Sequence, residues 1–193
     1  MQKWAYRLAA IASISLSSLA AHADTVYTYT GHAFTISDAP YDSSDSVSGS
    51  FTVASPLAAN MVLPSNFTWG SSNVNWTSFS FSDGFDPAIT NLTVNPEFAL
   101  LAVGTDSSGD ITSWYVSFVI ADFSSQLTTT TFGDPIDYGL EINGGSAQVD
   151  NNPGTWSSST STDSAATPEP SSLALLGTGL VAMCGAIRRR VRI

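Results

Sequence analysis

Lysine and arginine are absent from most of this 193-residue chain. No basic residue lies between positions 24 and 167, whereas 15 of the 16 acidic residues do, so this segment has a formal side-chain charge of −15. Without cationic side chains, it cannot form Lys or Arg salt bridges or clamp a phosphate group with them. Nucleic-acid binding is excluded, because it requires neutralisation of phosphate charge. Acidic polysaccharides and anionic membrane surfaces should also be repelled unless divalent cations intervene.

Cysteine and histidine are almost as scarce. The single cysteine, Cys184, lies in an apolar run near the end of the chain, so residues 24–167 have neither a disulfide nor a thiol nucleophile. His32 is the only histidine in that range, which argues against a zinc site. A Ser-His-Asp triad built on His32 is an alternative, but no nucleophile-elbow glycine pattern surrounds any serine. We therefore assign no catalytic residue.

Long apolar runs occur only at the two ends of the chain. Lys3 and Arg7 begin an N-terminal segment that continues with an apolar run at 8–19 and the small-x-small sequence Ala21-His22-Ala23. This order predicts a signal peptide over residues 1–23, with the Sec machinery and signal peptidase as partners. Cleavage after Ala23 would leave Asp24 as the first residue. A retained N-terminal anchor is the alternative, and the short apolar run disfavours it.

The second apolar run, residues 171–187, has 17 residues and no charge. As a helix it would cover about 26 Å, at about 1.5 Å per residue, which is a minimal transmembrane span. The arginines that follow should stay on the cytoplasmic side and can lengthen the span by snorkelling. Before the run, Pro168-Glu169-Pro170 cannot continue a helix backwards and should form an accessible, extended segment.

These features resemble the PEP-CTERM sorting signal of Gram-negative envelope proteins. The resemblance covers residues 167–193 and rests on the motif Pro168, Glu169 and Pro170, the apolar run from Ser171, and the closing arginines Arg188, Arg189, Arg190 and Arg192. It implies recognition by an exosortase, a membrane-embedded cysteine protease or transpeptidase that would remove the helix and the basic end. It also implies a host that makes exopolysaccharide, and a passenger domain that is first anchored in the membrane and then reaches the cell surface or extracellular matrix. A plain, uncleaved anchor is the alternative.

The segment between the two ends reads as one all-β domain over residues 24–156. Short alternating runs rich in Val, Thr, Phe, Tyr and Trp are separated by Gly, Pro, Asn, Asp and Ser, and no helical periodicity is present. This pattern predicts a single antiparallel β-sandwich or jelly-roll, flanked by the signal helix and the C-terminal transmembrane helix. Residues 157–167 are rich in Ser and Thr and predict a flexible linker.

The clearest predicted unit is a β-hairpin over residues 98–121. Residues 98–103 are apolar on both faces, which suggests a central strand, and Asp106-Ser107-Ser108-Gly109 predicts the turn. In the returning strand Trp114, Val116, Phe118 and Ile120 share one face. In the run at 74–81, the apolar parity switches, which predicts a β-bulge near Thr77 and Ser78.

Three kinds of ligand chemistry are conceivable in the domain. Trp69 and Trp156 lie in loop-like contexts and are candidates for stacking on a sugar ring. Asp106 and Asp110 are candidate ligands for a structural calcium ion, although turn chemistry explains both positions equally well. Glu97 and Glu141 are the only glutamates that a glycoside hydrolase-like enzyme could use in this domain.

The sequence therefore predicts an exported, exosortase-sorted protein of the cell envelope or the exopolysaccharide matrix, with a non-catalytic β-sandwich and no cofactor. The first alternative is a carbohydrate-binding module, which an exposed row of aromatic side chains would favour. The second is a glycoside hydrolase-like enzyme, which two facing carboxylates in a cleft would favour.

Overall fold

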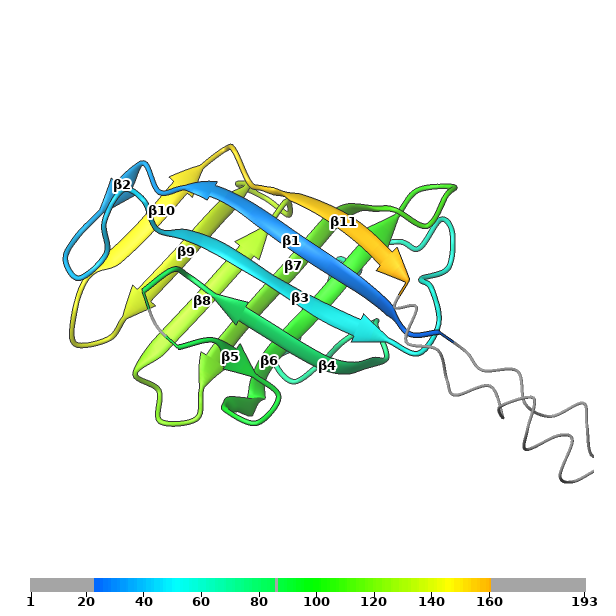
Figure 1. Ribbon diagram of the computed structural model, residues 1–193, viewed down its shortest axis with the longest axis horizontal. Coiled ribbons are helices and arrows are strands. Elements are labelled where there is room, and N and C mark those ends of the chain that lie inside the picture. Colours follow the sequence, from blue (N-terminus) through cyan, green and yellow to red (C-terminus); the bar gives the residue numbers. More distant parts are fainter. Residues whose placement is uncertain (1–22, 86, 161–193) are drawn as a thin grey trace, which may run out of the picture. The chain divides into compact units, whose positions relative to one another are not determined.

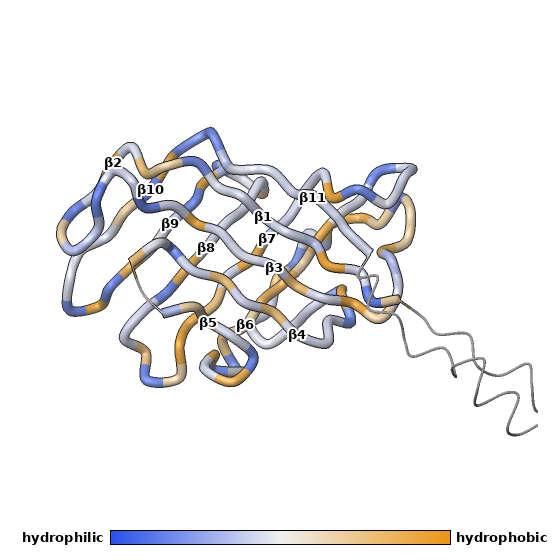
Figure 2. Tube along the Cα trace, viewed as in Figure 1, coloured by the Kyte–Doolittle hydropathy of each residue, from blue (hydrophilic) through white to orange (hydrophobic). Residues whose placement is uncertain are grey.

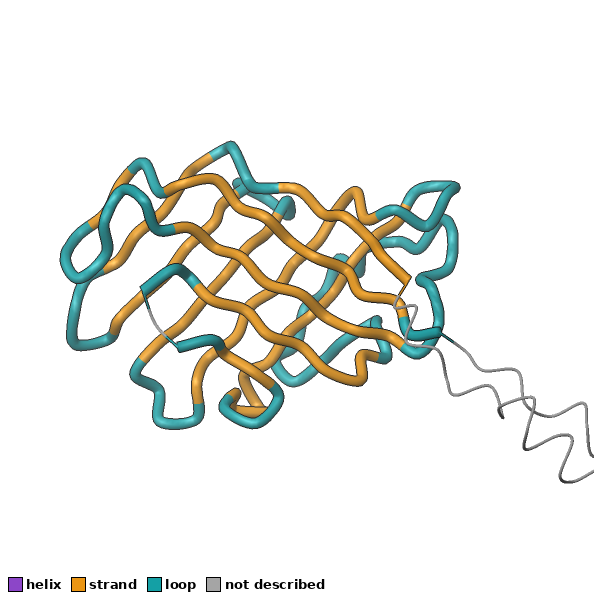
Figure 3. Tube along the Cα trace, viewed as in Figure 1, coloured by secondary structure: helices purple, strands orange, loops and turns teal. Residues whose placement is uncertain are grey.

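The computed structural model describes residues 23–85 and 87–160. This part of the chain contains strands, turns and loops and no helix, as Figure 3 shows. Its strands form two antiparallel sheets that pack on each other through their inner faces (Figure 1). The predicted all-β sandwich is confirmed. No helix in the described residues is long and apolar enough to cross a membrane, and the predicted signal helix and C-terminal helix both lie outside them.

The first sheet has five strands in the order β11-β1-β3-β4-β5. Its strands are β1 (Thr25–Ala33), β3 (Ser46–Val53), β4 (Trp76–Ser82), β5 (Ile89–Thr90) and β11 (Thr155–Thr160). The second sheet has six strands in the order β2-β10-β9-β8-β7-β6. Its strands are β2 (Ile36–Ser37), β6 (Val94–Thr105), β7 (Ile111–Ile120), β8 (Ser125–Thr130), β9 (Ile136–Glu141) and β10 (Ser146–Asp150). Strands β6 to β10 are neighbours in both sequence and space, so successive hairpins build most of this sheet.

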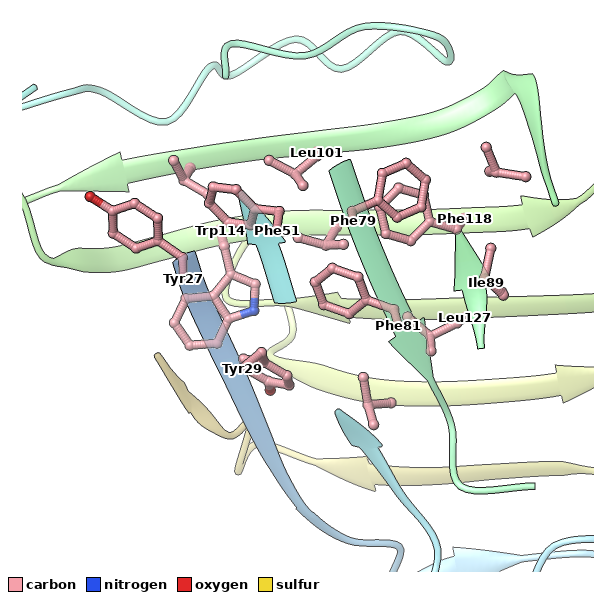
Figure 4. Packing of buried hydrophobic residues seen from close by; sticks show 14 of the residues in the cluster. Tyr27, Tyr29, Phe51, Phe79, Phe81, Ile89, Leu101, Trp114, Phe118 and Leu127 are labelled. Atoms are coloured by element: carbon pink, nitrogen blue, oxygen red, sulfur yellow. The ribbon is translucent and has the colours of Figure 1, made fainter. Parts of the chain in front are cut away.

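Alternating side chains from both sheets fill the space between them (Figure 4). The first sheet contributes mainly aromatic rings, and the second contributes Trp114 and Phe118 among aliphatic side chains. Phe79 of β4 stacks on Phe118 of β7, with ring centroids 4.4 Å apart and planes at 4°. Burial of each such side chain contributes about 1.5–3 kcal/mol to folding. The core is thus made by facing aromatic residues, and it needs neither a disulfide nor an ion pair.

The predicted hairpin and bulge are both confirmed. Strands β6 and β7 pair antiparallel, and their turn closes through a 3.0 Å hydrogen bond from the Asp106 amide to the Asp110 carbonyl oxygen. Gly109 takes a φ of 88° in this turn, a conformation that favours glycine. In β4, Ser78 pairs with Thr52 and Trp76 pairs with Val53, so Thr77 is the extra residue of a bulge.

One part of the hairpin prediction is wrong. Residues 98–103 belong to β6, which is the edge strand of its sheet and not a central one. The strand is nevertheless buried on both faces: Leu101 and Val103 point into the core, and Leu100 and Ala102 on the other face are each only 3% exposed. A long connection, residues 57–75, bonds to this edge, so a loop takes the place of the neighbouring strand that the pattern suggested.

The domain also ends later than predicted. Strand β11 pairs with β1 from Thr155 opposite Thr30 to Thr160 opposite Thr25. Residues 157–160, the first four of the predicted linker, therefore belong to the sheet, and the rest of the linker lies outside the described residues. Their polar composition is typical of a linker, but backbone hydrogen bonds to β1 and the packing of Trp156 fix this segment. On the solvent side an edge strand needs no apolar residue.

Candidate functional site

Asn73 holds the connection 57–75 against the edge of β6. Its side-chain Nδ2 donates to the carbonyl oxygen of Val103 at 2.7 Å, and its Oδ1 accepts from the Val103 amide at 3.0 Å. The side-chain amide therefore satisfies both backbone groups of one edge residue, as a neighbouring strand would. Edge strands that lack such cover are templates for unwanted pairing with other chains.

Two further bonds place Trp69 over the outer face of the six-stranded sheet. The Ser72 hydroxyl donates to the carbonyl oxygen of Leu101 at 2.7 Å, and the Gly70 amide donates to that of Ala99 at 3.0 Å. The backbone next to Trp69 is thereby tied to β6. Trp69 is 47% exposed and its ring lies 5.7 Å from that of Phe98, so it has the accessibility that the sugar-stacking prediction requires.

Other aromatic side chains extend this region along the same sheet. The Phe98 ring also contacts Phe123 at 5.4 Å, in the turn between β7 and β8. On the same connection Phe67 stacks on Tyr115 of β7 at 4.6 Å and meets Phe132 edge-on at 4.9 Å. Phe123 and Phe132 are 46% and 45% exposed. We call these residues the aromatic surface: Phe67, Trp69, Phe98, Tyr115, Phe123 and Phe132.

Phe123 has an unfavourable backbone conformation. Its φ is 61°, in the left-handed region that glycine and asparagine enter readily and that a bulky side chain rarely occupies. The turn itself would be served better by one of those residues. Strained positions of this kind concentrate at functional sites. This strained turn therefore holds the ring of Phe123 against Phe98 while leaving it nearly half exposed at the surface.

Trp156 is not part of this surface, and its prediction as an exposed stacking residue is wrong. It lies in β11 and packs against the core, with its ring 5.1 Å from Tyr29, 5.4 Å from Phe51 and 6.2 Å from Trp114. Pairing of β11 with β1 places it directly opposite Tyr29. The Gly, Asn and Pro residues before it indicated a loop, but the strand begins immediately after them, at Thr155.

A buried polar pair joins the two sheets. The Tyr29 hydroxyl of β1 donates to Asp137 Oδ1 of β9 at 2.6 Å and accepts a 2.6 Å bond from the Gly154 amide. Asp137 is fully buried, and its Oδ2 has no hydrogen-bond partner in the described part of the chain. Burial raises the pKa of the Asp137 carboxyl, although its hydrogen bonds oppose the shift. Burial and the nearby Asp137 charge also raise the pKa of Tyr29.

The second buried pair is Tyr41 with Asp83. The Tyr41 hydroxyl donates to Asp83 Oδ2 at 2.6 Å, and Asp83 is 2% exposed. Both atoms lie close to Gly139 of β9: a Cβ at that position would be 2.9 Å from Asp83 Oδ2 and 3.1 Å from the Tyr41 hydroxyl. Tyrosine hydroxyls thus serve as donors to both of these buried carboxyls, in a domain that has no Lys or Arg. The sequence does not reveal either pair, because nothing in the strand pattern distinguishes an inward Asp from one in a turn.

The calcium candidates form a turn. Asp106 Oδ1 accepts hydrogen bonds from the amides of Ser108 at 2.7 Å and Asp110 at 3.1 Å, which is ordinary Asp turn chemistry. In residues 23–85 and 87–160, no group of three or more His, Cys, Asp or Glu side chains is placed to hold a metal ion. The described geometry therefore gives the calcium prediction no support.

The enzyme alternatives gain no support either. Glu97 lies on β6 and Glu141 at the end of β9, and these strands are three places apart in the sheet. Their backbones are thus about 14 Å apart at the usual strand spacing, which does not present them as a facing pair of the kind that a glycosidase uses. His32 is exposed on β1 and has no hydrogen bond to a serine among the described residues.

The signal-cleavage residues and the sorting motif are almost entirely outside the described residues. Ala23 and Asp24 are described and exposed, directly before β1, whereas Ala21 is not described. Also outside are the sorting residues Pro168, Glu169 and Pro170 and the arginines Arg188, Arg189, Arg190 and Arg192.

Comparison with known proteins gives one match, at the end of the chain. Residues 166–190 match the model of the PEP-CTERM protein-sorting motif. No curated protein and no solved structure matches the chain. The matched residues include the predicted Pro-Glu-Pro segment, the apolar run and three of the four arginines. This motif supports export and sorting by an exosortase. The chain therefore carries a PEP-CTERM protein-sorting motif at residues 166–190, after a β-sandwich domain.

Proposed function

We propose that the protein is a non-catalytic component of the cell envelope or of the exopolysaccharide matrix, cut by signal peptidase after Ala23 and by an exosortase near Pro168-Glu169-Pro170. The observation that carries this proposal is the sorting motif at residues 166–190. The domain supports it: strand β1 begins at Thr25, so cleavage after Ala23 leaves the sheet intact. Its surface chemistry suits an extracellular polymer better than nucleic acid, since it has no Lys or Arg.

The test is the position of the chain's C-terminus in membrane and extracellular fractions of a host that has an exosortase. Trypsin finds no Lys or Arg between Arg7 and Arg188, so cleavage at Asp residues is used before mass spectrometry. We expect extracellular chains that end near Glu169 and lack the arginines. The variant Pro168→Ala/Glu169→Ala should stay in the membrane with an intact end, whereas Ser164→Ala, in the preceding segment, should be sorted normally. Unprocessed wild-type chains that are found only in the membrane would refute the proposal.

A carbohydrate-binding role is the second candidate, and the aromatic surface favours it. Trp69, Phe123 and Phe132 are nearly half exposed on one face of the domain, and Phe123 keeps its place in spite of a strained backbone. Aromatic faces stack on the apolar faces of sugar rings, and a tryptophan is large enough to cover one ring. We expect Trp69→Ala and Phe123→Asn each to reduce co-sedimentation of the protein with its host's polysaccharide several-fold.

The matched control for these variants is Val62→Ala. Val62 is 84% exposed and lies on the same connection, 57–75, as Trp69, but its side chain is aliphatic. Its substitution should leave co-sedimentation unchanged. Equal loss in all three variants would mean that the effect is not specific to the aromatic rings, and no loss in either Trp69→Ala or Phe123→Asn would exclude this surface.

A further inference from the structure

The outer face of the five-stranded sheet consists almost entirely of hydroxyl side chains. The strand registers place 13 residues on this face, of which 12 are Ser or Thr and one is Val26. All of them are exposed or half-exposed. Figure 2 shows strands β11, β1, β3 and β4 mostly in pale colours, which mark residues of intermediate hydropathy. The hydroxyl face, as we call it, comprises Thr155, Ser157, Ser159, Thr28, Thr30, Ser48, Ser50, Thr52, Ser78, Ser80, Ser82 and Thr90.

This composition is more restricted than solvation of a sheet requires. The outer face of the other sheet is mixed: cross-strand pairing puts Tyr115, Ile136 and Tyr138 among its residues. On the hydroxyl face no position is acidic, although residues 24–167 contain 15 acids. It is a broad uncharged region on an otherwise strongly acidic domain.

The centre of the face is a shallow, open hollow of about 380 Å³. Six Ser and Thr residues line it: Thr28, Thr30, Ser48, Ser50, Ser80 and Ser82. The side chains of Thr28, Thr30, Ser48, Ser50 and Ser80 make no hydrogen bond within the described part of the chain. Each of these hydroxyls can donate and accept, so it can pair with a hydroxyl of a ligand in either sense.

We propose that the hydroxyl face binds a neutral, linear, hydroxyl-rich polysaccharide, with the hollow as the centre of contact. Charge decides the class of polymer. A uronic-acid polymer would meet an acidic domain without a Lys or Arg to offset repulsion, whereas a neutral glycan meets an uncharged, hydrogen-bonding surface. This inference deepens the proposed matrix role and rests on it for the source of the polymer.

Size and spacing agree with an extended glycan. Rows of hydroxyls repeat at the strand spacing of about 4.8 Å, close to the length of one pyranose ring in an extended chain. Small side chains let a polymer approach the backbone closely, and they lose little rotamer entropy when they bind. Each hydrogen bond contributes only about 0.5–1.5 kcal/mol net, so affinity must come from several hydroxyls acting together along one chain.

The test is native electrophoresis of the full-length protein, purified in detergent, through gels that contain hydroxyethylcellulose or alginate. The first polymer is neutral and the second is acidic. We expect retardation by hydroxyethylcellulose only. The double variant Thr28→Val/Thr30→Val keeps the shape of both side chains and removes two hydroxyls from the hollow, so it should raise the apparent Kd at least fivefold. Thr112→Val, an exposed position on β7 of the other sheet, is the matched control and should bind as the wild type does.

A second variant, Ser50→Ala/Ser80→Ala, covers the case in which the first does not fold, and thermal unfolding of each variant checks this. Three outcomes would overturn the inference. They are a wild-type protein that hydroxyethylcellulose does not retard, retardation by alginate instead, and variants that bind as well as the wild type does. The matrix proposal fails separately. Hydroxyl-dependent retardation of a protein that its host never releases from the membrane would refute only the matrix role, and release without retardation would refute only the hydroxyl face.

Discussion

Tyr29 and Asp137 connect the two sheets through a 2.6 Å hydrogen bond between buried side chains. Tyr29→Phe removes the hydroxyl and leaves the Asp137 carboxyl without this donor. An unsatisfied buried polar group costs about 1–3 kcal/mol, so we expect the free energy of unfolding in urea to fall by that amount. Tyr138→Phe is the control, since Tyr138 is a half-buried residue whose hydroxyl has no hydrogen bond among the described residues. Equal stability of the two variants would show that the pair contributes nothing.

The same carboxyl should make the domain less stable as pH rises. Burial raises the pKa of Asp137 above its value in the unfolded chain, about 3.9 for a free Asp. Between the unfolded and the folded pKa, the folded state holds a proton that the unfolded state has lost, so the free energy of unfolding decreases with increasing pH. Below the unfolded pKa the contribution is fully present.

Asp137→Asn isolates this effect. Asp42 and Asp122, both at the surface, have lowered pKa values, because Ser44 and Ser124 donate hydrogen bonds to them. Their effect on the free energy of unfolding is opposite to that of Asp137: it increases stability as pH rises. They are present in both proteins, so the difference between wild type and Asp137→Asn reports Asp137 alone. We expect this difference, measured by urea unfolding from pH 3 upward, to favour Asn increasingly as pH rises. A difference that does not change with pH would contradict the assignment.

The two tryptophans with similar sequence surroundings should differ strongly in how much stability their substitution costs. Trp156→Ala removes a ring packed against Tyr29, Phe51 and Trp114 and should cost about 3 kcal/mol of stability, the low end for such a truncation because the side chain is only half-buried. Trp69→Ala removes an exposed ring and should change stability by less than about 1 kcal/mol. Thermal or urea unfolding of the two variants measures this directly, and similar losses would contradict the structural distinction between them.

Asn73 should protect one amide of the β6 edge from exchange with solvent. In the wild type the Val103 N–H donates to Asn73 Oδ1 at 3.0 Å, and we expect slow hydrogen exchange at this position. Asn73→Ala should accelerate exchange at Val103 and cost about 1–3 kcal/mol, because it leaves two backbone groups of the edge unpaired. Asn73→Asp is the informative comparison: it keeps the acceptor for Val103 N–H but loses the donor to the Val103 carbonyl, so exchange should be affected less than stability.

Local patterns in the sequence predict the fold well where the strands are regular. The alternation of Trp114, Val116 and Phe118 predicts the inner face of β7, Gly109 predicts the turn, and the parity switch predicts the bulge at Thr77. Each of these features depends on neighbouring residues alone. The side-chain hydrogen bonds that cover the edge of β6 come from Asn73, 30 residues before Val103. No local sequence pattern predicts them.

The candidate site is harder to read from sequence for the same reason. Trp69 and Trp156 both lie in loop-like sequence surroundings, but strand pairing with a segment more than a hundred residues away decides the burial of Trp156. The hydroxyl face is another case. Its residues are common and unremarkable in each strand, and only the pairing of five strands brings twelve of them together.

Thr25 and Thr160 pair at the outer ends of β1 and β11, so the domain begins and ends at one place. A domain whose ends are neighbours tolerates a new connectivity, since a short bridge can join them while the chain is opened elsewhere. The Asp106–Gly109 turn is a suitable opening, because it links only the adjacent strands β6 and β7. The sandwich is therefore a natural subject for circular permutation, and in a permuted protein the sorting segment would follow β6 instead of β11 in the chain.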